Sequence, residues 1–189
     1  MEKIIKEYIK ASIDVKTKLL NSPEVIKSIK DVVQAIKECF EKGGKLLVFG
    51  NGGSASDAQH MVAEFVARFK KERKALPAIA LTTNTSTITA LANDYTYDIV
   101  FKRQIEAFAD SNDVVLGIST SGTAKSVIEG LKQARSQNAK TIALTGKDGG
   151  ELPKVSDISI IVPSDITACI QESHIMIIHL ICEIVEANY

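Results

Sequence analysis

Residues 45–54 read KLLVFGNGGS, an apolar run that ends in a glycine-rich polar turn. Near-continuous apolar runs of this length are typical of strands buried on both faces of a parallel sheet. Four further runs rich in Ile, Val and Leu have the same character, at residues 78–83, 113–120, 141–146 and 157–163. Segments of helical length separate the runs. The sequence therefore predicts an α/β fold with a doubly wound, five-stranded parallel sheet flanked by helices.

Two helices are expected before the first strand. Apolar residues recur at helical spacing within residues 4–13 and 25–36. Between these stretches, Ser22 is a plausible N-cap and Pro23 suits the first helical position. Gly43 and the glycine after it are expected to end the second helix.

A last helix is expected at about residues 167–187. Its sequence is apolar around much of its circumference, so it needs cover on more than one side. We therefore expect a single domain over residues 1–189, with a helical pair in 1–43 and the α/β core and last helix in 44–189. We also expect a homo-oligomer whose interface uses these helices.

The composition argues against several classes of protein. Lys plus Arg and Asp plus Glu each number 23 in 189 residues, so the formal net charge is zero, unlike that of a protein that binds nucleic acid through bulk positive charge. The charged amino terminus lacks a signal-peptide core, and the most apolar late stretch, residues 175–185, is too short to span a bilayer. The three cysteines lack CxxC spacing, so we expect reduced thiols in a cytosolic protein.

Several predicted strands end in small or polar residues, in turns that read GNGGS, TTNTS, STSGT and LTGKDGG. Ligands of open parallel sheets bind where such turns converge, so the four turns predict one pocket. Residues 119–123 offer hydroxyls and N–H groups before a helix that begins near Ala124, which suits a phosphate. In residues 51–54 the glycines permit close approach of a ligand, and Ser54 can cap the next helix. An ordinary serine/threonine turn and a glycine turn without a ligand are the alternatives.

His60 and Glu64 are four residues apart on the helix after the glycine turn, so they share one face within about two turns of the predicted pocket. Such a pair can hold a metal or supply a base with an orienting partner; the alternative is a surface pair that stabilises the helix. Polar residues also interrupt the apolar last helix, where they need a partner or a function. They are Gln171, Glu172, His174, His179 and Glu183. A structural role is a simple explanation for His174.

The chain combines NGGS followed by HxxxE with ANDY at residues 92–95, GISTSG, LTGKDGG and QExHxxxxH. In this order and spacing, and over nearly the whole chain, the motifs resemble the phosphoheptose isomerase family of the sugar isomerase (SIS) fold. STSG alone would indicate only a SIS domain, whereas LTGKDGG and QExHxxxxH beside NGGS are more specific. The resemblance implies an intramolecular oxidoreductase that converts sedoheptulose 7-phosphate to D-glycero-D-manno-heptose 7-phosphate, a heptose precursor of lipopolysaccharide or capsule.

The resemblance also implies a set of site residues. Glu64 and His179 would be the acid–base pair, and His60, Glu64, Gln171 and His179 would bind one zinc ion per subunit. The substrate would contact Asn51, Gly52, Gly53, Ser54, Glu64, Asn93, Asp94, Ser119, Thr120, Ser121 and Gln171, with the phosphate on residues 119–121 and with Asn93 and Asp94 after a short helix. The family is cytoplasmic and homotetrameric, so we expect no nucleic-acid or membrane partner.

Two positions depart from the family pattern. Ala124 stands where members commonly have a further substrate-binding serine, so that hydrogen bond is lost unless Thr123 or Ser126 replaces it. Ala168 and Cys169 stand just before the glutamine, where many members have an acidic residue or arginine, and no role is transferred to either.

Interconversion of an aldose and a ketose moves a proton between neighbouring carbons, through an enediolate. Glu64 has the position and type of the base, and His179 suits the acid. A zinc ion on the substrate oxygens would stabilise the enediolate. Because a carboxylate that binds zinc loses basicity, we expect the metal to be loosely held or displaced during turnover.

Gln171 and His179 are eight residues apart, about 12 Å along one helix, which is too far for one ion. Either the helix begins after Gln171 or the ligands come from two subunits. We favour a site completed across a subunit interface, because the apolar last helix needs a partner.

Two other functions are alternatives. A non-catalytic SIS-domain adaptor of the type that associates with the bacterial replication initiator shares NGGS and the tetramer. It lacks the acidic residue at the position of Glu64 and the histidine at the position of His179, and this chain has both. An isomerase or sensor of another sugar phosphate, such as an amino-sugar phosphate, would need contacts that the sequence does not reveal.

Overall fold

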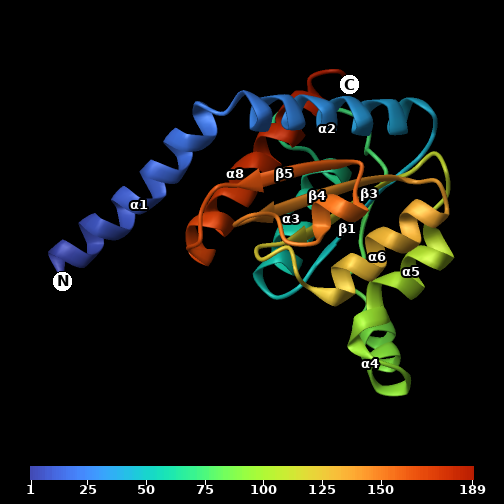
Figure 1. Ribbon diagram of the computed structural model, residues 1–189. Helices are drawn as coiled ribbons and strands as arrows, with labels where there is room; N and C mark the ends of the chain where they lie inside the picture. The colour runs from blue at the N-terminus through green and yellow to red at the C-terminus, as the bar shows by residue number, and fades with distance from the viewer.

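A computed structural model describes residues 1–189 and contains one five-stranded sheet between two layers of helices (Figure 1). The strands are β1 Leu46–Gly50, β2 Ala78–Ala80, β3 Val114–Ser119, β4 Lys140–Gly146 and β5 Ile158–Val162. All pair in parallel, in the order β2-β1-β3-β4-β5. The predicted α/β fold with a five-stranded parallel sheet is confirmed.

The strand order places a switch point between β1 and β3. From β1 the chain moves outward to β2, then returns past β1 to β3 and continues to β5 on the other side. Open parallel sheets bind ligands at the carboxyl ends of the two strands that flank such a point. The turns that follow β1 and β3 are the NGGS and STSGT turns, so the topology brings the two predicted ligand turns together.

Nine helical segments surround the sheet: α1 Glu2–Leu20, α2 Pro23–Glu41, α3 Gly53–Val66, α4 Thr85–Asp94, the 3₁₀ turn η1 Tyr97–Ile99, α5 Val100–Phe108, α6 Lys125–Ser136, α7 Leu152–Val155 and α8 Thr167–Glu186. Helices α1, α2, α3 and α8 share a hydrophobic cluster on one face of the sheet. Helices α5, α6 and α7 share the cluster on the other face.

Successive residues of β1 alternate between the two hydrophobic clusters. Leu46 and Val48 belong to the cluster with α3 and α8, whereas Leu47 and Phe49 belong to the cluster with α5 and α6. This period of two is what a strand covered on both faces requires. All residues of β1 and β3 are buried, as predicted. The edge strands differ: β2 has only three residues with Ile79 exposed, and β5 is partly exposed, because helices cover an edge less completely.

Local signals placed the start of α2 correctly and the start of α3 slightly wrongly. Ser22 caps α2 by accepting a hydrogen bond from the Val25 N–H, and Pro23 is the first helical residue. Helix α3 begins at Gly53, with Gly52 as its N-cap and no side-chain cap. The prediction that Ser54 caps this helix is therefore wrong, because the glycine turn enters the helix two residues earlier and Ser54 is buried in its first turn.

Helix α8 packs on α3, α2, α1 and the sheet. By length and composition it would pass as a membrane-spanning helix, and half of its most apolar window is buried inside the protein, as in a core helix. The expectation that its apolar stretch is too short to span a bilayer is corrected: the whole helix has 20 residues and is long enough.

Helix α1 extends away from the body of the protein (Figure 1). Val15 and Leu19, near its carboxyl end, are its buried residues. Five apolar side chains on the remainder are at least half exposed, namely Ile4, Ile5, Tyr8, Ile9 and Ile13. An apolar face of this kind favours association with another chain, and the homo-oligomer stays a prediction.

Candidate functional site

His60, Glu64 and His179 come together between α3 and α8. His60 Nε2 lies 3.0 Å from Glu64 Oε1 and 3.3 Å from His179 Nε2. The spacing of four residues puts the first two side chains on one face of α3, and the packing of α3 against α8 brings His179 to them. His60 therefore links the predicted base to the predicted acid within one chain. The His60 side chain is about half exposed, so the cluster is open to a ligand.

The His60 nitrogen has two polar neighbours but at most one proton to share. If its N–H points at the Glu64 carboxylate, it cannot also accept a hydrogen bond from His179. A cation shared by the three groups would resolve this conflict, and two imidazoles with a carboxylate are a donor set that zinc accepts. The donor chemistry thus fits zinc, although as the side chains stand no group of three His, Cys, Asp or Glu residues forms a metal site.

Gln171 lies at the other end of the site. A Cβ atom added at Gly53 would come within 2.0 Å of Gln171 Nε2, so this amide packs on the first residue of α3. Because α8 begins at Thr167, the alternative that the helix starts after Gln171 is wrong. Gln171 and His179 lie on one continuous helix, about 12 Å apart along its axis. Three of the four predicted zinc ligands converge in this chain and Gln171 does not join them.

The turn after β3 is shaped by Gly122, which has φ +69°. A Cβ atom there would lie 1.9 Å from the carbonyl oxygen of Gly149 in the turn after β4, so the two turns touch through backbone alone. Ser119 is buried at the end of β3, and Thr120 follows it. The Ser121 and Thr123 hydroxyls lie 2.9 Å apart. This turn carries hydroxyls and N–H groups and no acidic side chain, which suits an anion.

Asn51 lies in the turn after β1, and both the nitrogen and the oxygen of its side-chain amide form hydrogen bonds. Its Nδ2 donates to Ser126 Oγ at 3.0 Å, and its Oδ1 accepts from the Tyr97 hydroxyl at 2.8 Å. Ser126 is buried and its oxygen accepts the bond from Asn51, while its O–H stays available as a donor, so its replacement of the hydroxyl missing at Ala124 stays a prediction. Tyr97 was not among the predicted site residues, although its place two residues after the ANDY motif was a signal that could have found it.

Asn93 and Asp94 lie in the last turn of α4, not after it as expected, since α4 runs to Asp94. Asn93 Nδ2 donates to Asp94 Oδ1 at 3.0 Å. Helix α4 packs chiefly on η1 and α5, so the two residues are not brought against His60 or His179.

His174 is fully buried and lies beneath the site rather than in it. Its Nε2 lies 3.0 Å from the carbonyl oxygen of Thr145 at the end of β4, while its Nδ1 has no partner. Burial lowers the pKa of His174 to about 4, and the bond to Thr145 opposes this only in part. The neutral imidazole joins α8 to β4, so His174 has a structural role, as expected for this residue.

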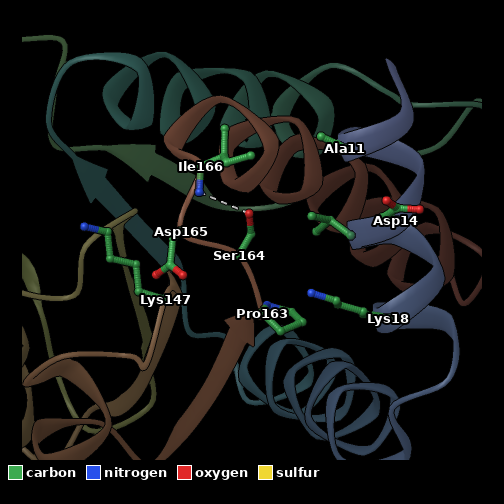
Figure 2. A pocket seen from close by; sticks show the side chains of 9 residues that line it. Ala11, Asp14, Lys18, Lys147, Pro163, Ser164, Asp165 and Ile166 are labelled. Atoms are coloured by element: carbon green, nitrogen blue, oxygen red, sulfur yellow. Dashed lines mark hydrogen bonds between the residues drawn. The ribbon is translucent and has the colours of Figure 1, made fainter. Parts of the chain in front are cut away.

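A groove of about 500 Å³ lies between α1 and the segment that joins β5 to α8. Figure 2 shows the side chains that line it. Lys18 on α1, Lys147 after β4, and Ser164 and Asp165 after β5 are among the residues that line it. None of the predicted site residues lines this groove, so it is separate from the His60 cluster.

Comparison with known proteins identifies the family. A family model described as SIS domain matches residues 7–146. The chain is 53% identical over 182 residues to the phosphoheptose isomerase of Citrifermentans bemidjiense, covering 96% of this chain and 94% of the relative. The chain belongs to the phosphoheptose isomerase family.

Solved structures of phosphoheptose isomerases agree with this assignment. The structure from Francisella tularensis has a TM-score of 0.93 at 39% identity, covering 98% of this chain and 97% of that one. The structure from Neisseria gonorrhoeae has a TM-score of 0.92 at 37% identity, covering 98% of both chains. The likeness to phosphoheptose isomerases confirms the SIS fold over nearly the full length, the two amino-terminal helices included.

Proposed function

We propose that this protein is an aldose–ketose isomerase that converts sedoheptulose 7-phosphate to D-glycero-D-manno-heptose 7-phosphate, for heptose precursor synthesis in the cytoplasm. The observation that carries the proposal is the contact of His60 with both Glu64 and His179, beside the switch point of the sheet. The relatives named phosphoheptose isomerase, about 50% identical over nearly the whole chain, support the choice of substrate.

The substrate would lie along the carboxyl ends of β1 and β3. Its phosphate would rest on Ser119, Thr120 and Ser121, where hydroxyls and N–H groups precede α6. The carbon chain would extend over the NGG turn, beside Gln171, toward α3. The carbonyl end of the sugar would then lie near Glu64 and His179, which is where the proton transfers occur.

The reaction needs one proton to leave C1 of the ketose and one to arrive at C2. Glu64 would remove the C1 proton while His179 gives a proton to the C2 oxygen, which yields the enediol. The carboxylic acid at Glu64 would then return its proton to C2. His179 would take the proton of the C1 hydroxyl, which leaves the aldehyde and restores both side chains. His60, in contact with both groups, would hold their relative orientation.

Zinc fits this proposal as a ligand of His60, Glu64 and His179, the three groups whose donor types suit it. When bound, it would supply a Lewis acid that stabilises negative charge on the substrate oxygens. Gln171 would serve as a fourth ligand only if it came from another subunit, since within one chain it lies against Gly53. The exposed apolar face of α1 supports an assembly of several chains, for which we propose a homotetramer.

The test is to incubate the purified protein with sedoheptulose 7-phosphate, with and without a chelator, and to follow aldose formation. We expect turnover in the wild type and a loss of at least about a hundredfold in Glu64→Gln and in His179→Gln. Glu129→Gln on α6, a partly exposed carboxylate paired with Lys132, is the matched control and should retain full activity. Sugar-phosphate binding without turnover in the wild type would instead favour the adaptor or sensor. Undiminished activity in Glu64→Gln would exclude Glu64 as the base.

A further inference from the structure

The segment between α3 and β2, residues 67–77, has no regular secondary structure, yet it is firmly attached to the end of α8. Its attachment point is Glu186, which is only 2% exposed. The Glu186 carboxylate accepts hydrogen bonds from the N–H groups of Phe69, Lys70 and Lys71, at 2.8, 2.6 and 2.9 Å. One buried carboxylate thus fixes three consecutive residues of the backbone.

Arg73 completes this anchor. Its Nε lies 3.3 Å from Glu186 Oε1 without hydrogen-bond geometry, so the contact is a buried ion pair. Its guanidinium donates to the carbonyl oxygens of Phe65 and Glu64, at 2.7 and 2.8 Å, in the last turns of α3. Burial alone would raise the pKa of Glu186, but the three N–H groups and Arg73 lower it below its ordinary value, so the carboxylate stays charged. Buried charges paired in this way hold a specific geometry.

The anchored segment places the Phe69 ring on His179. The two ring centroids are 5.5 Å apart and the planes are inclined by 25°, an offset stack. The stacking partner of His179 is thus the first of the three residues whose N–H groups Glu186 fixes. His179 has a second contact, in which its Nε2 lies 3.3 Å from His60 Nε2. The imidazole is therefore held by an aromatic face and by a polar contact at the ring edge.

The charged groups around Phe69 also belong to the anchored segment or to α8. The Lys70 ammonium lies 5.5 Å from the centroid of the Phe69 ring and 2.8 Å from Glu183 Oε1 on α8. This exposed pair adds a second connection between the segment and α8, of the modest strength expected at a surface. Neither charged group forms a hydrogen bond with His179.

We propose that Phe69 is a positioning residue for His179: its ring, fixed through the backbone by Glu186 and Arg73, restricts the rotation of the imidazole so that Nε2 stays directed at His60 and the substrate. The inference rests on the proposed function for its kinetic consequence only. Proton transfer by an imidazole is slower when the ring is spread over several rotamers, because the donor atom is then often misplaced. Small misplacements in an active site lower the reaction rate strongly.

The first test observes the imidazole directly, in metal-free protein labelled with ¹³C-histidine. The chain has three histidines, so three sets of ring signals are expected, and His179→Gln identifies the signals of His179. Stacking places the His179 ring protons over the aromatic face of Phe69. Phe69→Leu should therefore move the His179 signals downfield, leave those of buried His174 in place, and leave the protein folded. Phe69→Tyr, which keeps the ring, should preserve the wild-type positions.

The second test separates kcat from KM. We expect Phe69→Leu to lower kcat about tenfold while KM changes less than about twofold, because the orientation of an acid is lost and not a substrate contact. Phe69→Tyr should restore kcat. Phe108→Leu, at an exposed phenylalanine on α5, is the control and should leave both constants unchanged.

Several outcomes would overturn the inference. His179 signals that do not move in Phe69→Leu would show that the ring does not hold the imidazole. A raised KM with unchanged kcat would make Phe69 a substrate contact. If Phe69→Leu does not fold, Phe69→Met replaces it with the same expectations. A wild-type protein without isomerase activity would contradict the proposed function alone, since the signals of His179 still report on the stack.

Discussion

His179 Nε2 lies 3.3 Å from His60 Nε2, although 119 positions of sequence separate the two residues. The contact exists because α3 and α8 lie side by side on one face of the sheet. His60 also lies 3.0 Å from Glu64, which makes it the central member of the three.

This central position predicts that His60 matters for both metal binding and rate. We expect His60→Gln to reduce zinc affinity and kcat each by about ten- to a hundredfold, because a group that ligates or orients a ligand is removed. Zinc titration and steady-state kinetics measure the two effects. Gln59→Ala, at the exposed neighbour whose side chain contacts Thr82, is the control. Unchanged zinc affinity in His60→Gln would remove this residue from the proposed ligand set.

Substitution by alanine should have different effects at two glycines, Gly53 and Gly122. In Gly53→Ala the new methyl group displaces the flexible Gln171 amide, so the free energy of unfolding should change by less than about 1 kcal/mol, while KM rises. In Gly122→Ala the methyl group meets the Gly149 backbone at a left-handed φ, so stability should fall by about 2 kcal/mol or more. Urea unfolding and KM distinguish the two. A severely destabilised Gly53→Ala would indicate that Gln171 cannot move.

Ala124 is the N-cap of α6, with extended backbone angles and no side chain able to cap the helix. Ala124→Ser supplies a hydroxyl at this position, so we expect it to stabilise the protein by about 1 kcal/mol in urea unfolding. The same hydroxyl restores the serine common in the family, and we expect KM for the sugar phosphate to fall several-fold because a hydrogen bond to a charged group is gained. A stabilised variant with unchanged KM would confine the effect of the serine to the cap.

His174 predicts a loss of stability in mild acid. Its pKa is about 4 in the folded protein against 6.5 for the ordinary side chain, so between these values the unfolded chain binds a proton that the folded protein does not. The contribution of neutral His174 to the free energy of unfolding is complete above pH 6.5 and is lost as the pH falls toward 4. The total loss is about 3 kcal/mol. Urea unfolding at a series of pH values measures the slope. His174→Gln should flatten this slope, whatever its effect on stability at pH 7, and an unchanged slope would contradict the assignment.

The buried pair of Glu186 and Arg73 predicts a large cost for breaking it. Glu186→Gln leaves the Arg73 charge buried without its partner, so we expect a loss of about 3–5 kcal/mol in the free energy of unfolding. Asp31→Asn removes one partner of an exposed pair with Lys27 and should cost less than about 1 kcal/mol. Equal costs in the two variants would show that the Glu186 anchor does not hold residues 69–71.

The five strands, the two amino-terminal helices and the last helix were predictable from the sequence alone. Apolar runs marked all five strands, the Ser22–Pro23 signal placed the start of α2, and motif order indicated the family. These features depend on residues close in sequence, whose periodicity and capping chemistry can be recognised locally. The error at Ser54 has the same origin: two glycines fit more than one turn geometry, so the start of α3 was misplaced by two positions.

Which functional groups meet depends on long-range packing that the sequence did not reveal. The strand order, the contact of His60 with His179, the separation of Gln171 from both, and the stack of Phe69 on His179 all depend on how α3, α8 and residues 67–77 pack. Helical spacing fixes the axial distance between Gln171 and His179, but not which neighbour each side chain reaches. That is set by contacts between segments more than a hundred residues apart, because packing and buried charge, rather than local propensity, determine them.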